Sequence, residues 1–149
     1  MRTYTNGVTV AAICSLAAFA AEQRVKMEDL PVAVRNTVKN QSQGAQVRGF
    51  SKETENGKVF YEAELKIDGR NRDLLIAADG TVVEVEEEVA LELLPPSVKA
   101  AYEKRAAKGK IESVESVSKG GQIVAYEARV RVGGKVSEVR LSPTGAPLE

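Results

Sequence analysis

Two glutamates in matching sequence contexts are the residues whose type and spacing best suit chemistry. Glu62 and Glu127 each stand at the centre of a Tyr-Glu-Ala tripeptide, within two stretches that resemble each other along their length. Two carboxylates held close together can act as the acid and the base of glycoside hydrolysis. The alternating pattern around each glutamate favours instead a solvated position on the outer side of an amphipathic strand. A hydrolase centred on this pair is therefore kept only as an alternative.

Other catalytic groups are scarce in this sequence. It contains no histidine, which is the commonest general base and the commonest transition-metal ligand. It also contains no phosphate-binding loop, dinucleotide-binding fingerprint or serine nucleophile motif. We therefore predict a protein that is not an enzyme, with no catalytic residue, no metal site and no cofactor.

The first 20 residues have the composition of a secretory signal peptide. Arg2 precedes an uncharged apolar run from Val8 to Ala20, which is too short to cross a bilayer as a helix. Its last three residues, Ala18-Phe19-Ala20, include the small side chains that signal peptidase requires at its cleavage site. We predict cleavage before Ala21, no membrane insertion of the mature chain, and a periplasmic or secreted location.

Composition limits what the mature chain can use for stability and for binding. The single cysteine, Cys14, lies inside the predicted signal peptide, so the exported chain has no disulfide and no thiol nucleophile. The full sequence has 21 basic and 21 acidic residues, which cancel and produce no overall field that would attract nucleic acid. We therefore expect stability to come from packing, and the partner to be an envelope or secreted protein rather than nucleic acid.

Each Tyr-Glu-Ala tripeptide lies in a predicted β-strand, in the stretches from Val59 to Gly69 and from Val124 to Gly134. Apolar and polar residues alternate there, so each strand has an apolar side and a polar side. The alternation places Tyr61 and Tyr126 on the apolar side, where core packing is expected. The opposite side holds the predicted partner-binding residues: Phe60, Glu62, Glu64, Lys66, Glu127, Arg129 and Arg131.

Two short helices are predicted to cover the apolar sides of these strands. Each begins at a Leu-Pro pair and ends before a glycine, Gly44 in the first case and Gly109 in the second. Apolar residues recur every fourth position and form one stripe on each helix. The stripes are Leu30, Val34 and Val38 on the first helix, and Leu94, Val98 and Tyr102 on the second.

Irregular spacing appears at the same place after each helix. Val47 and Phe50 are three positions apart, which is an odd spacing, and so are Ile111 and Val114. Neither segment can alternate cleanly as a strand, so we predict a β-bulge or bend in both.

A fourth strand is predicted from Thr81 to Glu87. Its valines, Val83 and Val85, would point inward, and the glutamates between them outward. The acidic run in this region could bind cations or a basic partner, but it is interpreted as a solvated strand edge. It consists of Glu84, Glu86, Glu87 and Glu88.

The recurrence of these elements indicates an internal duplication. We divide the chain into a signal peptide (1–20), a flexible lead-in (21–28), a first repeat (29–89) and a second repeat (90–149). The predicted fold class is α+β, with two αββββ repeats and a short helix packed on one face of the antiparallel sheet in each. The last strand is expected to be stunted because Pro147 falls within it.

Several short motifs resemble those of tandem PepSY-like domains. They are the Leu-Pro pair that opens each helix, the aromatic-Glu pairs Tyr61-Glu62 and Tyr126-Glu127, and Asp79-Gly80 before a last strand. The chain resembles exported bacterial proteins described as beta-lactamase-inhibitor-like, or BLIP-like. This resemblance implies a helix and a four-stranded antiparallel sheet per repeat, and a role in binding or inhibiting proteins of the cell envelope. The disulfides of the beta-lactamase inhibitor itself are absent, so inhibition of a lactamase does not carry over.

Together these observations predict an exported, non-enzymatic protein that recognises or inhibits a protein partner, such as a peptidase, through an open sheet face. The alternative is a periplasmic carrier or sensor that holds a small ligand between the helices and the sheet.

Overall fold

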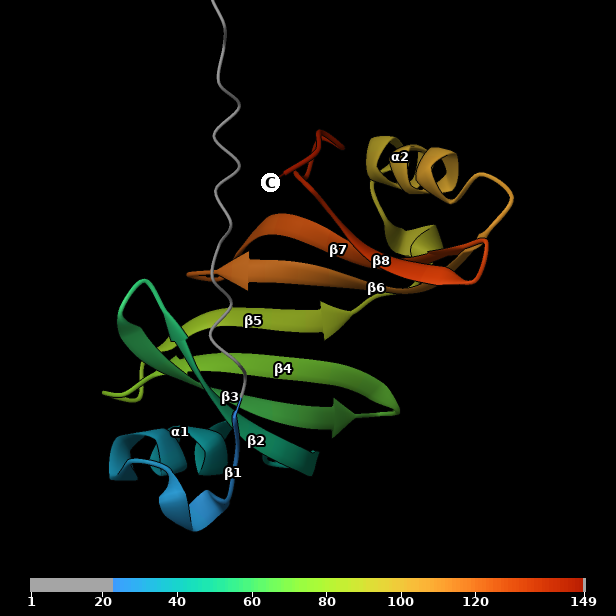
Figure 1. Ribbon diagram of the computed structural model, residues 1–149. Coiled ribbons are helices and arrows are strands. Elements are labelled where there is room, and N and C mark those ends of the chain that lie inside the picture. The colour runs from blue at the N-terminus through green and yellow to red at the C-terminus, as the bar shows by residue number, and fades with distance from the viewer. Residues whose placement is uncertain (1–22, 149) are drawn as a thin grey trace, which may run out of the picture.

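The alternating segments of the sequence pair into one antiparallel sheet, in a computed structural model that describes residues 23–148 (Figure 1). The strands hydrogen-bond in the order in which they follow one another along the chain. They are β1 (Gln23–Val25), β2 (Gln46–Glu55), β3 (Lys58–Ile67), β4 (Arg70–Ala77), β5 (Val82–Glu88), β6 (Lys110–Lys119), β7 (Gln122–Val132) and β8 (Lys135–Leu141). The α+β class and the antiparallel sheet are confirmed.

Two helices interrupt the succession of strands along the chain. Helix α1 (Val32–Gln41) lies before β2, and α2 (Pro96–Ala106) lies before β6. Each follows a short 3-10 turn, η1 (Met27–Asp29) or η2 (Leu91–Leu93). All residues of the predicted stripes are buried: Leu30, Val34, Val38, Leu94, Val98 and Tyr102. The predicted helix starts at the Leu-Pro pairs were wrong, because Leu30 and Leu94 lie at the ends of the 3-10 turns and precede the helices.

Both helices cover the same face of the sheet. Leu74 of β4 lies opposite Val85 of β5, which lies opposite Ser118 of β6. Side chains alternate between the two faces along a strand, so Val114 is on the same face as Ser118. Leu74 packs in the core under α1, and Val114 packs in the core under α2. The other face has no helix over it among residues 23–148, and we call it the open face.

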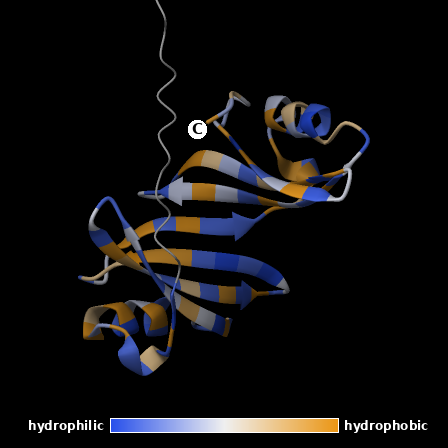
Figure 2. Cartoon of the chain, viewed as in Figure 1, coloured by the Kyte–Doolittle hydropathy of each residue, from blue (hydrophilic) through white to orange (hydrophobic). Residues whose placement is uncertain are grey.

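The helix-covered face holds two separate hydrophobic cores. The first surrounds α1 and includes Phe50, Leu65 and Ile76, and the second surrounds α2 and includes Tyr126 and Leu141. The buried residues of one core do not occur in the other. Figure 2 shows the alternation of apolar and polar residues along the strands that form these cores.

The junction between β5 and β6, which we call the seam, joins the two halves of the sheet. Four residue pairs form it, from Val85 opposite Ser118 to Glu88 opposite Glu115. One further backbone hydrogen bond continues the ladder, donated by the Val89 N–H to the Val114 carbonyl at 2.9 Å. The two halves therefore share one continuous sheet.

The predicted irregularities occur in the first long strand of each half. The register between β2 and β3 shifts between Val47 and Gly49, and that between β6 and β7 shifts between Ile111 and Ser113. Each shift inserts an extra residue into the strand. Both predicted bulges are confirmed.

Strand β5 differs from the prediction in its inward side chains. Leu75 lies opposite Glu84, but the next residue, Ile76, lies opposite Val82, so Val83 is an extra residue in a bulge. Val82 and Val85 pack against the first core. The expected inward position of Val83 was wrong because a bulge reverses the alternation at that point.

Part of the segment expected to be a flexible lead-in forms β1, which pairs with Phe50 to Lys52 of β2. Up to residue 148, strand β8 is followed by only an isolated bridge between Leu141 and Pro147, which corresponds to the stunted last strand. The predicted signal peptide, residues 1–20, lies outside the described residues. No helix within residues 23–148 is long and apolar enough to cross a membrane.

Candidate functional site

The predicted partner-binding residues all fall on the open face. Glu62 of β3 lies opposite Ser51 of β2 and Leu75 of β4, and Glu127 of β7 lies opposite Glu115 of β6 and Arg140 of β8. Strand alternation extends this placement to the other candidates on the same two strands. These are Phe60, Glu64 and Lys66 on β3, and Arg129 and Arg131 on β7.

The sheet keeps Glu62 and Glu127 apart. Strands β4, β5 and β6 lie between the strands that hold them. At about 4.8 Å per strand step, their backbones are roughly 19 Å apart. The carboxylates of glycoside hydrolases lie no more than about 9.5 Å apart. This separation is inconsistent with the hydrolase alternative that pairs these two residues.

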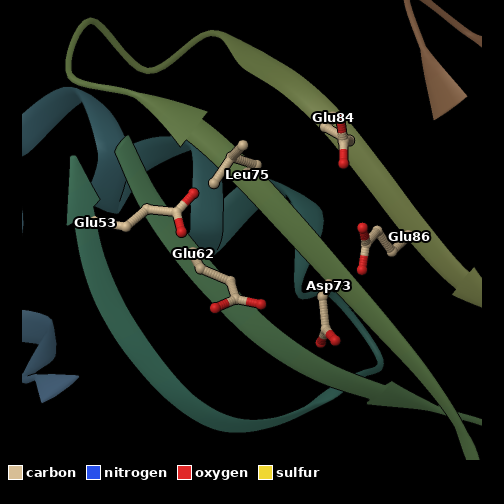
Figure 3. A pocket seen from close by; sticks show the side chains of 6 residues that line it. All are labelled: Glu53, Glu62, Asp73, Leu75, Glu84 and Glu86. Carbon is tan, nitrogen blue, oxygen red and sulfur yellow. The ribbon is translucent and has the colours of Figure 1, made fainter. Parts of the chain in front are cut away.

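A hollow of about 140 Å³ lies on the open face across β2 to β5. Five of its six lining residues are acidic, and Figure 3 shows their carboxylates around Leu75. Of the residues that line this hollow, only Glu62 was predicted from the sequence to bind a partner. The acidic lining residues are Glu53, Glu62, Asp73, Glu84 and Glu86.

The acidic run of β5 is not a strand edge. Strand β5 lies between β4 and β6 in the interior of the sheet, and the side chain of Glu84 is only 12% exposed. Glu84 Oε2 contacts Lys119 Nζ at 2.8 Å, and Glu84 Oε1 contacts Arg140 Nη2 at 3.7 Å. Arg140 Nη1 also lies 3.6 Å from Glu127 Oε2. The prediction of a solvated strand edge was wrong because the sequence does not reveal that β6 pairs with β5.

Burial and mutual repulsion disfavour ionisation of the carboxylates nearest the seam. Burial is the main cause that raises the pKa of Glu86 to about 8, and the charges of Glu127, Glu115 and Glu84 add to it. Burial likewise raises the pKa of Glu115 to about 7, assisted by Asp73. The pKa of Asp73 and that of Glu127 are also raised, mainly by burial.

Besides Lys119 and Arg140, which contact Glu84, further basic groups lie toward the sides of this acidic region. Arg24 of β1 contacts Glu64, with Nη1 and Oε1 2.6 Å apart. On β7, Arg131 Nε donates to Glu112 Oε1 at 2.6 Å, and this contact lowers the pKa of the Glu112 carboxyl. Arg129 lies opposite Glu138 of β8. The open face is therefore acidic over β4 to β6 and mixed in charge toward β1 and β7.

A second hollow lies on the connection that follows β5. It also has a volume of about 140 Å³, and its lining includes Val89, Leu91 and Ile111. Pockets for drug-sized ligands usually measure about 300–1,000 Å³. Neither hollow reaches that size, so their volumes do not favour the alternative of a small-ligand carrier.

Comparisons with known proteins establish the fold. No family model matches the sequence, and no curated protein matches it. Solved structures from Bacteroides do match. One, a "putative periplasmic" protein from Bacteroides eggerthii, is 17% identical, with a TM-score of 0.64 over 80% of this chain and 86% of the other.

Two further structures match over the same share of this chain, 80%. A DUF2874 family protein from Bacteroides ovatus is 19% identical, with a TM-score of 0.59 over 85% of its chain. A BLIP-like protein from Bacteroides fragilis is 20% identical, with a TM-score of 0.56 over 84% of its chain. At these identities the similarity is one of fold.

Proposed function

We propose that this chain is an exported, non-enzymatic protein that recognises or inhibits a protein partner in the cell envelope through its open face. The observation that carries the proposal is an eight-stranded sheet with both helices on one face. The other face presents half-buried carboxylates beside arginines and lysines, an arrangement suited to electrostatic complementarity with a partner.

The dimensions of the open face suit a protein partner. Eight strands at a spacing of about 4.8 Å give a width of roughly 35 Å. A typical protein interface buries about 800 Å² on each partner, which a surface of this width can provide. The small size of the hollows supports contact over a broad surface in preference to enclosure of a small ligand.

Export to the periplasm has two lines of support. The first 20 residues have the composition of a signal peptide. The structural neighbour from Bacteroides eggerthii is described as a "putative periplasmic" protein. The neighbour from Bacteroides fragilis is described as BLIP-like. A peptidase of the envelope is one class of partner that such a protein would inhibit.

The two halves are interpreted as tandem PepSY-like repeats. Equivalent turns in the two halves pack against equivalent helix positions, which supports the duplication. A Cβ added to Gly80 would lie 2.9 Å from the Ala33 carbonyl oxygen of α1. A Cβ added to Gly145 would lie 2.8 Å from the Ser97 carbonyl oxygen of α2.

The proposal is tested by affinity capture from the native envelope fraction, using the mature chain as bait. The open-face variant carries Lys66→Glu and Arg129→Glu, which reverse two charges without touching the buried Ser51 or the seam. The matched control carries Lys39→Glu and Arg105→Glu, which make the same change in net charge on the exposed sides of α1 and α2.

We expect a partner that the native chain and the helix variant capture, and that the open-face variant loses at least about tenfold. Circular dichroism verifies that all three chains are folded. Equal capture by the open-face variant and the helix variant would contradict recognition through the open face. Failure to capture any protein would also count against the proposal, and native mass spectrometry for a bound small molecule would then test the carrier alternative.

A further inference from the structure

The seam is a short connection between two parts that each have a core of their own. Four residue pairs form it, whereas β2 and β3 pair over nine. Two apolar side chains, those of Val117 and Ala125, lie on the open face beside the seam and are 0% and 1% exposed. They belong to neither hydrophobic core. Little apolar packing therefore crosses from one half to the other.

Like charges lie directly opposite one another at and beside the seam. Glu88 of β5 lies opposite Glu115 of β6, and Glu115 in turn lies opposite Glu127 of β7. Asp73 of β4 lies opposite Glu86 of β5. Like charges at directly opposed positions destabilise an antiparallel pair. These carboxylates occupy two neighbouring rungs of the sheet: Asp73 and Glu86 on one, where Glu86 lies opposite Val117 across the seam, and Glu88, Glu115 and Glu127 on the next.

Basic side chains contact Glu84 and Glu127 but not Glu86 or Glu115. Lys119 and Arg140 both contact Glu84, and Arg140 also contacts Glu127. Glu88 Oε2 accepts a hydrogen bond from the Asn71 N–H at 3.0 Å. Among residues 23–148, no ion pair forms with Glu86 or Glu115.

Apart from each other, the charged neighbours of Glu86 and Glu115 come from four strands and are all acidic. Burial, with these like charges, holds the pKa of both carboxyls well above the ordinary value for glutamate. The acidic neighbours are Asp73 on β4, Glu84 and Glu88 on β5, Glu127 on β7 and Glu138 on β8. The basic side chains of Lys119 on β6 and Arg140 on β8 contact Glu84.

We propose that the seam is a pH-sensitive joint, in which ionisation of Glu86 and Glu115 loosens the pairing of β5 with β6 while each half keeps its own core. In their protonated form these side chains do not repel the neighbouring carboxylates, and Glu86 lies opposite the buried Val117. In their ionised form they require water, which a wider seam admits. The joint sets the relative orientation of the halves and therefore the shape of the open face.

This inference does not depend on the proposed function, because it concerns the isolated chain. Amide hydrogen exchange tests it, with rates corrected for the intrinsic effect of pH. The reporter is the Val89 N–H, which donates across the seam to the Val114 carbonyl. The references are the amides of β3 and β7 inside each half.

Between pH 6 and pH 9 we expect the protection of Val89 to fall at least about tenfold relative to the reference amides, since one unit of pKa shift corresponds to a tenfold change in an equilibrium. A variant with Glu86→Gln and Glu115→Gln should lose this pH dependence. The matched control is Glu55→Gln, an exposed position on β2 at the same face and away from the seam. It should behave as the native chain does.

Two results would overturn the proposal. One is a protection of Val89 that changes with pH only in step with the reference amides. The other is an equal pH dependence in the native chain and in the double glutamine variant. Circular dichroism at each pH verifies that the variants remain folded.

Discussion

Ser51 shows how a single side chain couples the open face to the stability of the sheet. It is 0% exposed although it lies on the face that no helix covers, and its hydroxyl donates to Glu62 Oε2 at 2.9 Å. A hydrogen bond to a charged group contributes about 1.5–3 kcal/mol. Ser51 therefore orients one of the carboxylates that line the acidic hollow.

Replacing Ser51 with alanine tests this role. We expect Ser51→Ala to lower the free energy of unfolding by about 1–3 kcal/mol, because the buried hydrogen bond is lost. Urea unfolding measures the change, and Ser137→Ala at an exposed position of β8 serves as the control. A change of the same size in both variants would mean that the Ser51 hydroxyl has no special role.

Alternation along the strands was enough to predict which residues share the open face. It placed Glu62 and Glu127 correctly on one side of their strands because a period of two follows directly from strand geometry. It did not predict the crowding of Asp73, Glu86 and Glu115. That crowding depends on which strands are neighbours, and the sequence of β5 contains no indication that β6 lies beside it.

At the scale of elements, the turn before β5 is held against α1. Gly80 has a φ of 88°, and Thr37 Oγ1 donates to its carbonyl oxygen at 2.6 Å. Gly57, in the turn between β2 and β3, also has a positive φ, of 76°, but a Cβ there would meet no atom within 4 Å. Comparing alanine substitutions at the two glycines therefore separates the cost of backbone strain from the cost of a steric clash.

We expect Gly80→Ala to destabilise the protein more than Gly57→Ala does. Both variants incur the cost of a left-handed conformation, about 1–2 kcal/mol. Only Gly80→Ala adds a clash with the Ala33 carbonyl oxygen. Thermal unfolding monitored by circular dichroism compares the two, and equal melting temperatures would contradict close packing of this turn on α1.

The end of α2 offers a stabilising change. Ala107 follows the helix with a φ of 47°, a conformation that glycine adopts without strain. We expect Ala107→Gly to raise the free energy of unfolding by up to about 1 kcal/mol. Ala106→Gly, one residue earlier and inside the helix, should lower it instead. Urea unfolding of both variants measures whether each substitution raises or lowers the free energy of unfolding.

Elements with strong periodicity were predictable, and those that depend on distant partners were not. The stripe of Val34 and Val38 and the odd spacing of Ile111 and Val114 are local patterns, so the helices and the first bulges followed from them. Strand β1 spans only three residues, too few to show a period of two. The bulge at Val83 arises where β5 meets β4, and a single strand contains no sign of it.

At the scale of the whole molecule, the carboxylates near the seam make stability depend on pH. The pKa of Glu86, about 8, and that of Glu115, about 7, exceed the ordinary value of 4.5. Between these values and 4.5 the folded chain binds more protons than the unfolded chain, so the free energy of unfolding falls as pH rises. The stabilisation is fully present below about pH 4.5 and is lost as pH rises through 7 and 8.

We expect the variant with Glu86→Gln and Glu115→Gln to be more stable than the native chain at pH 9, by about 1–2 kcal/mol after allowance for solvent screening. At pH 5 the two should differ little, because both carboxyls are then protonated in the folded native chain. Urea unfolding at the two pH values measures the difference. A variant with the same advantage at pH 5 as at pH 9 would show that charge is not the cause.

The order of the strands has a consequence for how the chain folds. Most strands pair with the next strand across a short turn, and such local pairings form quickly. The β1–β2 pairing and the seam are different, because a helix lies between their strands in the sequence. Closing these longer loops costs more conformational entropy before any stabilising contact between the strands can form.

We therefore expect each half to acquire its hairpins first and the seam to close late in folding. Pulse-labelling hydrogen exchange during refolding would detect this order as late protection of the Val89 N–H relative to amides of β3 and β7. Protection of all three in one phase would show instead that the two halves fold as a single unit. The sheet would then be a single cooperative structure in kinetics, even though its cores are two.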